Sequence, residues 1–208
     1  MSSIRFPGKV LASINGQPVI KMLIANFSDV VSPANIIVAT STETSDDPLA
    51  CYVQELGFSV FRGPLHNVFK RFSLCLEENP CEWFVRVCAD SPFLNLSILG
   101  QVLSCSNREE VDIVTNVFKR TFPAGQSVEM VLSRSFAEID QMSLLPEEEE
   151  HVTKVFYNNP DKFRIVNIES PDPALAKKHL AIDTLEDLRQ LEHSSERKCL
   201  QTHEYKYR

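Results

Sequence analysis

The amino-acid sequence predicts a single α/β domain in which helices cover a mostly parallel mixed sheet. Short apolar, β-branched segments alternate with longer amphipathic segments along the chain. The segments 35–40 and 83–88 are mostly apolar on both faces, which is typical of strands buried between two layers of helices. The 208 residues, of which 43% are hydrophobic and 24% charged, fit one ordinary globular domain.

The predicted strands are short and are bounded by turn residues. They cover residues 35–40, 59–62, 83–88, 111–116, 128–132, 163–167 and 179–182. The predicted helices lie between them, with Pro18 in the first turn of the first helix and Gly57 directly after the second. They cover residues 18–27, 47–56, 67–77, 96–104, 135–142 and 184–193. The acidic run 146–150 is interpreted as a solvated helix start.

Composition excludes several classes of protein. A net charge of −7 argues against a general nucleic-acid binder, which usually carries a basic excess. No segment approaches the about 18 apolar residues of a membrane span, and the first residues lack the apolar core of a secretory signal. We therefore expect a cytoplasmic protein with neither a membrane nor a nucleic acid as partner. The six cysteines form no C-x-x-C pair, so free structural thiols are expected.

A basic loop opens the chain. Arg5 and Lys9 stand four residues apart among small residues, with Pro7 and Gly8 between them. The backbone N–H groups of such a loop can form an anion nest, and the two cations can neutralise separate phosphates. Exposed cations without a function are the alternative interpretation of the same spacing, and the loop alone leaves both open.

Two aspartates follow predicted strands. Asp90 comes after the segment 83–88, and Asp183 comes after 179–182. Ligands of open α/β sheets bind beyond the carboxyl ends of the strands, and Mg²⁺ binds through one or two carboxylates plus substrate phosphates. Both aspartates also have a structural interpretation, since Asp90 could cap a turn and Asp183-Thr184-x-x-Asp187 resembles a helix capping box.

The order of several motifs is more specific than any one of them. Together they resemble the cytidylyltransferases that make CMP-activated sugars, which include the CMP-acylneuraminate and CMP-KDO synthetases. The subgroup that serves spore-coat and surface polysaccharide synthesis is the most similar. The matching segments are 3–11, 16–18, 38–40, 46–50, 61–63, 67–72, 85–93, 121–129, 150–153, 159–165 and 182–188.

The resemblance implies a three-layer α/β/α nucleotidyltransferase fold, GT-A-like and Rossmann-like, over residues 1–191, followed by a helical end or tail at 192–208. It implies that CMP is transferred from CTP to an acidic, nonulosonic or KDO-like sugar with release of pyrophosphate. It assigns Mg²⁺ to Asp90 and Asp183, and a phosphate-gripping, catalytic role to Arg5 and Lys9. Nucleotide contacts are expected from the opening loop, namely from Ser2, Ser3, Arg5, Gly8 and Lys9.

Sugar contacts are expected from four further residues, which are Arg71, Arg86, Glu129 and His151. Each has a structural alternative. If the Arg86 side chain is buried, it needs an anionic partner, and this partner could be Asp90 or Glu129 rather than a ligand. The related synthetases are commonly homodimers, so the segment 144–159 is expected to make dimer contacts.

The sequence also departs from the family pattern. In the family, a strand ending in Gln-Ala-Arg precedes the position of Met1, so the first strand is expected to be missing from this sequence and Met1 to be an internal methionine. Ala89, Ser127 and Asn67 replace a glycine and two aspartates. The missing strand, Ser127 and Asn67 favour the second hypothesis, a non-catalytic member that binds a nucleotide or a partner. A nucleotidyltransferase that uses another NTP is the third.

Overall fold

The computed structural model describes residues 1, 3–106, 110–139 and 142–204, with side chains up to residue 194. The strands of this range are β1 (Ser13–Ile14), β2 (Gln17–Pro18), β3 (Ile37–Ser41), β4 (Ser59–Gly63), β5 (Trp83–Arg86), β6 (Ile113–Thr115), β7 (Glu129–Leu132) and β8 (Ile165–Asn167). The α-helices are α1 (Val19–Ser28), α2 (Asp47–Glu55), α3 (Val68–Glu78), α4 (Leu96–Leu103), α5 (Ser133–Ile139), α6 (Pro146–Glu150), α7 (Lys154–Asn158) and α8 (Leu185–Glu204). Short 3₁₀ helices are η1 (Lys9–Leu11), η2 (Pro33–Asn35), η3 (Thr44–Asp46) and η4 (Pro173–Lys177).

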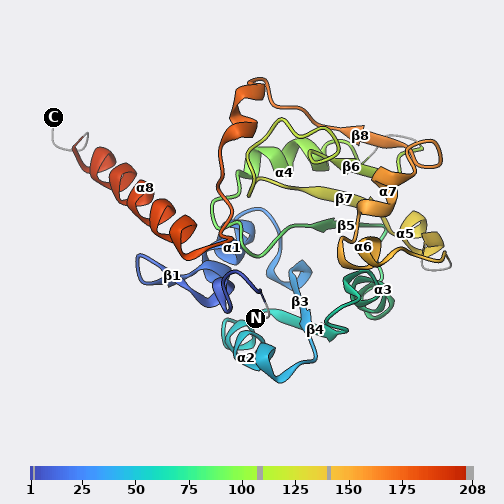
Figure 1. Cartoon of the computed structure of the whole chain (residues 1–208), viewed down its shortest axis with the longest axis horizontal. Helices are drawn as coiled ribbons and strands as arrows, with labels where there is room; N and C mark the ends of the chain where they lie inside the picture. Colours follow the sequence, from blue (N-terminus) through green and yellow to red (C-terminus); the bar gives the residue numbers. More distant parts are fainter. Residues whose placement is uncertain (2, 107–109, 140–141, 205–208) are drawn as a thin grey trace.

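The strands form a mixed layer that consists of two separate sheets (Figure 1). β3 pairs in parallel with β4. The second sheet has the order β5-β7-β6-β8, in which β7 runs antiparallel to both of its neighbours and β6 runs parallel to β8. β1 and β2 make a small antiparallel hairpin beside the layer. The predicted α/β fold with a mixed sheet is confirmed.

Successive strand residues of the four-stranded sheet face opposite layers of helices, as the pleat of a strand requires. One face packs against α1 and α4 and presents Val85, Met130, Val114 and Val166. The other face packs against α3, α5 and α7 and presents Phe84, Val131, Ile113 and Ile165. Burying an aliphatic side chain of this size stabilises the fold by about 1.5–3 kcal/mol. Two apolar faces therefore produce the three-layer arrangement.

The elements predicted from the sequence agree with the structure within a few residues, except for one strand. The acidic run 146–150 starts a helix as predicted, but Glu148 is buried rather than solvated, because it accepts from Leu145 N and Asn158 Nδ2. The predicted strand 179–182 is wrong, because only an isolated bridge between His179 and Ala124 forms there. Its backbone bonds to two loops instead, with Leu180 N donating to Ala124 O at 2.8 Å and Ile182 N to Asp90 O at 2.9 Å. The last part of the predicted helix 135–142 touches residues 140–141, which lie outside the described residues.

Helix α8 projects from the body of the molecule (Figure 1). It is continuous to Glu204, and the end of the domain at residue 191 stays a prediction. Residues 205–208 lie outside the described range. None of the helices in the described part of the chain is both long and apolar enough to cross a membrane. Five cysteines are described, and all are free: Cys51, Cys75, Cys81, Cys88 and Cys105.

Candidate active site

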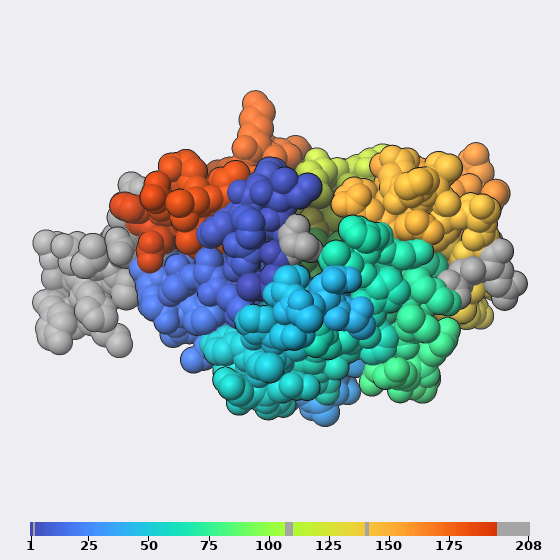
Figure 2. All heavy atoms as spheres, turned by 60° about the horizontal axis from the view of Figure 1, so that its bottom comes forward, coloured from blue at the N-terminus to red at the C-terminus, as the bar shows by residue number. Residues whose placement is uncertain are grey.

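The opening loop and the two predicted aspartates meet at one place. Lys9 Nζ lies 2.6 Å from Asp90 Oδ2 and 3.2 Å from Asp183 Oδ1. Arg5 Nη2 lies 2.9 Å from the same Asp183 oxygen. Figure 2 shows the first residues, in dark blue, beside the red segment of the C-terminal part. Two carboxylates and two cations thus form one charge-balanced cluster, which we call the aspartate cluster.

The loop that carries Lys9 is fixed at both ends. Gly8 has φ +75°, a left-handed conformation that glycine adopts without steric cost, and Leu11 N donates to Gly8 O at 2.9 Å. Val10 and Leu11 then pack against the apolar core between α1, α2 and the β3–β4 sheet. Ser3 Oγ accepts a hydrogen bond from Phe6 N at 3.4 Å, whereas Ser2 lies outside the described residues. The loop therefore returns Lys9 to the sheet edge.

Asp90 and Asp183 are held together by backbone contacts between their loops. Ile182 N donates to Asp90 O, which places the two aspartates on adjoining segments. Gly125, with φ +86°, packs against the same segment so closely that a Cβ there would lie 2.4 Å from the carbonyl carbon of Leu180. The position of Asp183 therefore depends on a glycine in a distant loop.

Helix α8 begins without using the Asp183 carboxylate. Asp187 Oδ2 accepts from Thr184 N at 2.8 Å, and Thr184 Oγ1 accepts from Asp187 N at 3.2 Å, which is a reciprocal cap. Burial alone would raise the pKa of Asp187, but the hydrogen bonds from Thr184 lower it. Thr184 and Asp187 therefore cap the helix in place of Asp183, and the Asp183 carboxylate contacts Lys9 and Arg5.

The aspartate cluster suits a hard cation. Both carboxylates contact one ammonium group, so a positive charge already lies between them. Burial alone would lower the pKa of Lys9, but the hydrogen bonds and charges of Asp90 and Asp183 raise it, which keeps Lys9 protonated. Among the residues that the structure describes, no group of three or more metal-binding side chains occurs. A divalent ion here would take two carboxylates from the protein and the rest of its ligands from phosphate and water.

Arg86 and Glu129 form a second, buried ion pair. Arg86 Nη1 lies 2.5 Å from Glu129 Oε2, and the exposed fractions of the two side chains are 22% and 2%. The sequence left Asp90 and Glu129 open as partners of Arg86, and the structure shows that the partner is Glu129. Arg86, Glu129 and Thr115 are cross-strand neighbours at the end of the sheet, directly after an apolar row. The alternation of the strands thus changes from apolar to polar at the edge where Asp90 follows.

Thr153, the N-cap of α7, and Tyr157 within α7 both bond to Glu129 of this pair. The sequence predicted neither residue as part of the site. Glu129 Oε1 accepts from Thr153 Oγ1 at 2.6 Å and from the Tyr157 hydroxyl at 2.5 Å. The Tyr157 oxygen also lies 2.8 Å from Thr115 Oγ1. The spacing of four residues between Thr153 and Tyr157 places both on one helix face. This spacing, together with the polar residues at the strand ends, is the pattern in the sequence from which these contacts could have been predicted.

The two clusters adjoin each other. Cys88 lies between Arg86 and Asp90 in the sequence. Burial raises the pKa of its thiol, and that pKa also responds to the charges of Arg86, Asp90, Glu129 and Lys9. Because Arg86 ends β5 and Asp90 follows four residues later, both clusters have a member at the carboxyl end of this strand.

No hydrogen bond or ion pair within the described residues joins Arg71 or His151 to these clusters. Arg71 Nη1 donates to Pro64 O at 3.0 Å, and its Nε is buried without a hydrogen bond. Burial lowers the pKa of Arg71, and the charge of Asp46 partly opposes this. The His151 side chain is exposed at the end of α6. Asn67 caps α3 by accepting from Lys70 N at 2.7 Å, as an aspartate could. Sugar contacts by Arg71, Glu129 and His151 stay predictions.

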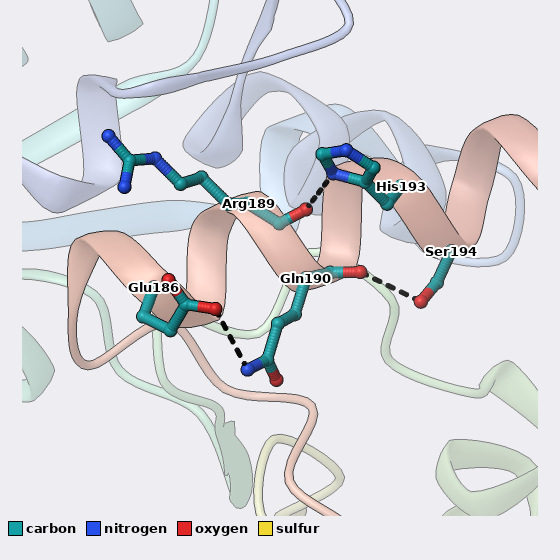
Figure 3. Close-up of a pocket in the computed structure, with 5 residues that line it drawn as sticks. All are labelled: Glu186, Arg189, Gln190, His193 and Ser194. Carbon is teal, nitrogen blue, oxygen red and sulfur yellow. Dashed lines mark hydrogen bonds between the residues drawn. The ribbon is translucent and has the colours of Figure 1, made fainter.

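One pocket lies elsewhere, along the exposed side of α8 (Figure 3). Two of its side chains bond within the helix, since Gln190 Nε2 donates to Glu186 Oε1 at 3.1 Å and Ser194 Oγ donates to Gln190 O at 2.7 Å. The lining residues are Glu186, Arg189, Gln190, His193 and Ser194. None of them belongs to the aspartate cluster or to the Arg86–Glu129 pair, so this pocket does not carry the predicted chemistry.

Known proteins resemble the chain over nearly its whole length. The spore coat polysaccharide biosynthesis protein SpsF of Bacillus subtilis (strain 168) is 28% identical over 193 residues, which cover 90% of this chain and 79% of SpsF. The structure of a cytidylyltransferase from Leptospira borgpetersenii superposes with a TM-score of 0.87 at 26% identity, covering 92% of this chain and 81% of that one.

A more distant structure shares the fold alone. It is a CMP:2-keto-3-deoxy-manno-octonic acid synthetase complexed with CTP, with a TM-score of 0.72 at 13% identity and 95% coverage of both chains. The cytidylyltransferase family model matches residues 1–206. The fold, the relatives and this match agree with one another, and the chain belongs to the cytidylyltransferase family.

Proposed function

We propose that the chain transfers CMP from CTP to an acidic sugar, of the nonulosonic or KDO type, and releases pyrophosphate for surface polysaccharide synthesis. Membership of the cytidylyltransferase family supports transfer from CTP. The name of SpsF supports a polysaccharide pathway, and the CMP-KDO synthetase supports an acidic acceptor only as a protein of the same fold. The observation that carries the proposal is the aspartate cluster, in which Lys9 contacts both Asp90 and Asp183.

The opening loop would bind the triphosphate. Arg5 and Lys9 supply two positive charges at the end of a loop with a left-handed glycine, Gly8. Charge-assisted hydrogen bonds from arginine and lysine to phosphate are among the strongest that proteins make. In this proposal the phosphates take over the two cations from the aspartates. The side chains of Arg5 and Lys9 then orient the triphosphate so that its leaving group is neutralised.

Asp90 and Asp183 would hold Mg²⁺, which when bound supplies charge neutralisation at the phosphate that is attacked. The remaining task of the protein is alignment. A sugar hydroxyl attacks the α-phosphorus and gives its proton to water, and the bond to pyrophosphate breaks, so no covalent enzyme intermediate is required. Holding the hydroxyl in line and fixing dipoles around the developing charge are enough for large rate accelerations.

The proposal is tested by pyrophosphate release. The purified protein is incubated with Mg²⁺, CTP and either N-acetylneuraminate or 3-deoxy-manno-octulosonate, and pyrophosphate is measured. We expect turnover that depends on all three components, with UTP and GTP much poorer than CTP. Asp90→Asn is expected to reduce kcat/KM by roughly 100-fold or more, the scale of losing one preorganised charged group. Asp29→Asn, an exposed aspartate after α1, is the matched control.

Two results would count against the proposal. Turnover with UTP or GTP in place of CTP would indicate a nucleotidyltransferase for another NTP. Binding of CTP without pyrophosphate release, with every acidic sugar tested, would indicate a non-catalytic member of the family.

A further inference from the structure

The Arg86–Glu129 pair is embedded in a chain of hydrogen bonds whose donors are all accounted for. A tyrosine has one O–H donor, and Tyr157 uses it toward Glu129. Thr115 Oγ1 then donates to the Tyr157 oxygen and itself accepts from Val117 N at 3.0 Å. Glu129 Oε1 thus accepts hydrogen bonds from Thr153 and Tyr157, and Glu129 Oε2 accepts one from Arg86. Each partner restricts the next, so the guanidinium of Arg86 is fixed by groups that it does not touch.

An aromatic contact supports this chain from outside. The rings of Tyr157 and Phe118 stack with their centroids 5.6 Å apart. Phe118 lies in the loop after β6, and Asn167 holds that loop by accepting from Lys119 N at 2.9 Å and donating to Lys119 O at 3.2 Å. The Tyr157 ring is therefore fixed on its face as well as at its hydroxyl. Such a restrained ring has little freedom to turn its hydroxyl away from Glu129.

Arg86 keeps one edge of its guanidinium for a ligand. Glu129 contacts Nη1, and no hydrogen bond or ion pair within the described residues uses Nε or Nη2. Nε and Nη2 have no partner within the described residues, and they are not fully buried. Both atoms are therefore in contact with solvent. Nε and Nη2 form one side of the planar fork, which matches the two oxygens of a carboxylate.

The position of this edge separates it from the triphosphate. The opening loop packs over the β3–β4 side of the layer, with Val10 and Leu11 in the core beside Val38 and Val60. Arg86, by contrast, pairs with Glu129 of β7, and Glu129 in turn accepts from Thr153 and Tyr157 at α7. A nucleotide held by the opening loop and a second substrate held by Arg86 would therefore be bound by different segments of the chain.

We propose that Tyr157 is a positioning residue that acts through Glu129 on Arg86, and that the Nε–Nη2 edge of Arg86 binds the carboxylate of the acceptor sugar. The proposal rests on the proposed function in its choice of an acidic sugar as acceptor. It assigns the sugar acid to Arg86, and it gives Tyr157, Thr153 and Thr115 the role of holding Arg86 in place.

The test compares Tyr157→Phe with Tyr52→Phe, a matched control in α2 whose hydroxyl makes no hydrogen bond within the described residues. Binding of N-acetylneuraminate, of its methyl ester and of 3-deoxy-manno-octulosonate is measured by calorimetry in the presence of CTP. We expect the unaltered protein to bind at least one free acid, and to bind the ester at least tenfold more weakly. Tyr157→Phe is expected to weaken binding of that acid about tenfold and to change CTP affinity less than twofold, since one hydrogen bond to a charged group is lost.

A double-mutant cycle separates positioning from general damage. Arg86→Lys keeps the charge beside Glu129 but removes the fork, and thermal unfolding checks that each variant is folded. If Tyr157 acts through Arg86, Tyr157→Phe changes sugar affinity less than twofold in the Arg86→Lys protein. Independent, multiplying effects would overturn the proposal. So would an unaltered protein that binds neither acid, or an equal affinity for acid and ester.

Pyrophosphate release by the unaltered protein judges the proposed function separately. A protein that binds the acid through Arg86 but releases no pyrophosphate refutes the transferase proposal and leaves the positioning role supported. If the unaltered protein releases pyrophosphate but the Tyr157→Phe variant has an unchanged KM for the sugar, the transferase proposal is supported and the positioning role is refuted.

Discussion

Lys9 is the residue on which the aspartate cluster depends, because it separates two like charges. Two unit charges about 4 Å apart interact by about 4 kcal/mol at the effective dielectric constant near a protein surface. Asp90 and Asp183 both contact Lys9 Nζ, so the ammonium offsets a repulsion that would otherwise oppose their approach. A bound divalent cation would do the same, and Lys9 and the metal are therefore expected to compete for the two carboxylates.

This competition gives a prediction for Lys9→Met. Without Mg²⁺, the variant is expected to have a lower thermal midpoint than the unaltered protein, because the aspartates then repel each other. Millimolar Mg²⁺ should raise the midpoint of the variant more than that of the unaltered protein, while pyrophosphate release falls roughly 100-fold or more. Lys21→Met, at an exposed position of α1, is the control and should respond to Mg²⁺ as the unaltered protein does. An equal response in Lys9→Met would contradict a metal site between the aspartates.

Tyr157 gives a prediction for pH. Burial raises the pKa of Tyr157, and the charge of Glu129 and the hydrogen bond to it raise the pKa further. The unfolded chain ionises this tyrosine near its ordinary pKa of about 10, whereas the folded protein keeps the proton. The stability that the hydroxyl contributes is therefore complete below about pH 10 and is lost as pH rises above it.

The measurement is the difference in the free energy of unfolding between the unaltered protein and Tyr157→Phe. We expect about 2 kcal/mol at neutral pH, the scale of a hydrogen bond to a charged group, and a smaller difference at about pH 11. A difference that stays constant from neutral pH into this alkaline range would show that the Tyr157 pKa is not raised.

At the scale of elements, Gly125 couples the loop before β7 to the segment that leads to Asp183. Its φ of +86° disfavours any side chain, and so does the position that a Cβ would occupy, 2.4 Å from the Leu180 carbonyl carbon. Gly125→Ala is expected to destabilise the protein by about 3 kcal/mol or more, from left-handed strain plus a backbone clash. It should also reduce activity, because Asp183 must move with Leu180.

Gly57→Ala is the matched control for this prediction. Gly57 has a similar φ of +84°, but nothing lies within 4 Å of the place of a Cβ. It should cost only the strain, about 1–2 kcal/mol, and leave kcat unchanged. Urea unfolding and pyrophosphate release on both variants check the comparison, and equal effects of the two substitutions would show that the contact with Leu180 is unimportant.

At the scale of the whole molecule, the site is assembled from segments that meet only in the folded state. A ligand that binds this state alone stabilises it, by about 2.7 kcal/mol at a concentration 100 times its Kd. For a protein of this size that corresponds to a rise of about 5–10 °C in Tm. We expect CTP with Mg²⁺ to produce such a rise, and CTP with a chelator or UTP with Mg²⁺ to produce a clearly smaller one. Thermal scans with each combination provide the measurement, and equal shifts for CTP and UTP would contradict cytosine recognition.

The sequence predicts local features well because they depend on neighbours in the chain. The apolar residues of 83–88 identify a strand that is buried on both faces, although the strand itself ends at Arg86. The pattern Thr184-x-x-Asp187 identifies the start of α8, and the reciprocal cap confirms it. The segment 179–182 has the apolar pattern of a strand, but its partners in space are loops, so the prediction of a strand there is wrong.

What the sequence by itself determined is the family, the order of most helices and strands, and the residues Arg5, Lys9, Asp90 and Asp183 as a set. Only the tertiary structure decided which groups pair: Lys9 with both aspartates, Arg86 with Glu129 rather than Asp90, and Tyr157 with Glu129. The physical reason is distance along the chain. Lys9 and Asp183 are 174 residues apart, and no local propensity specifies a contact that forms only when separate loops pack at one edge of a sheet.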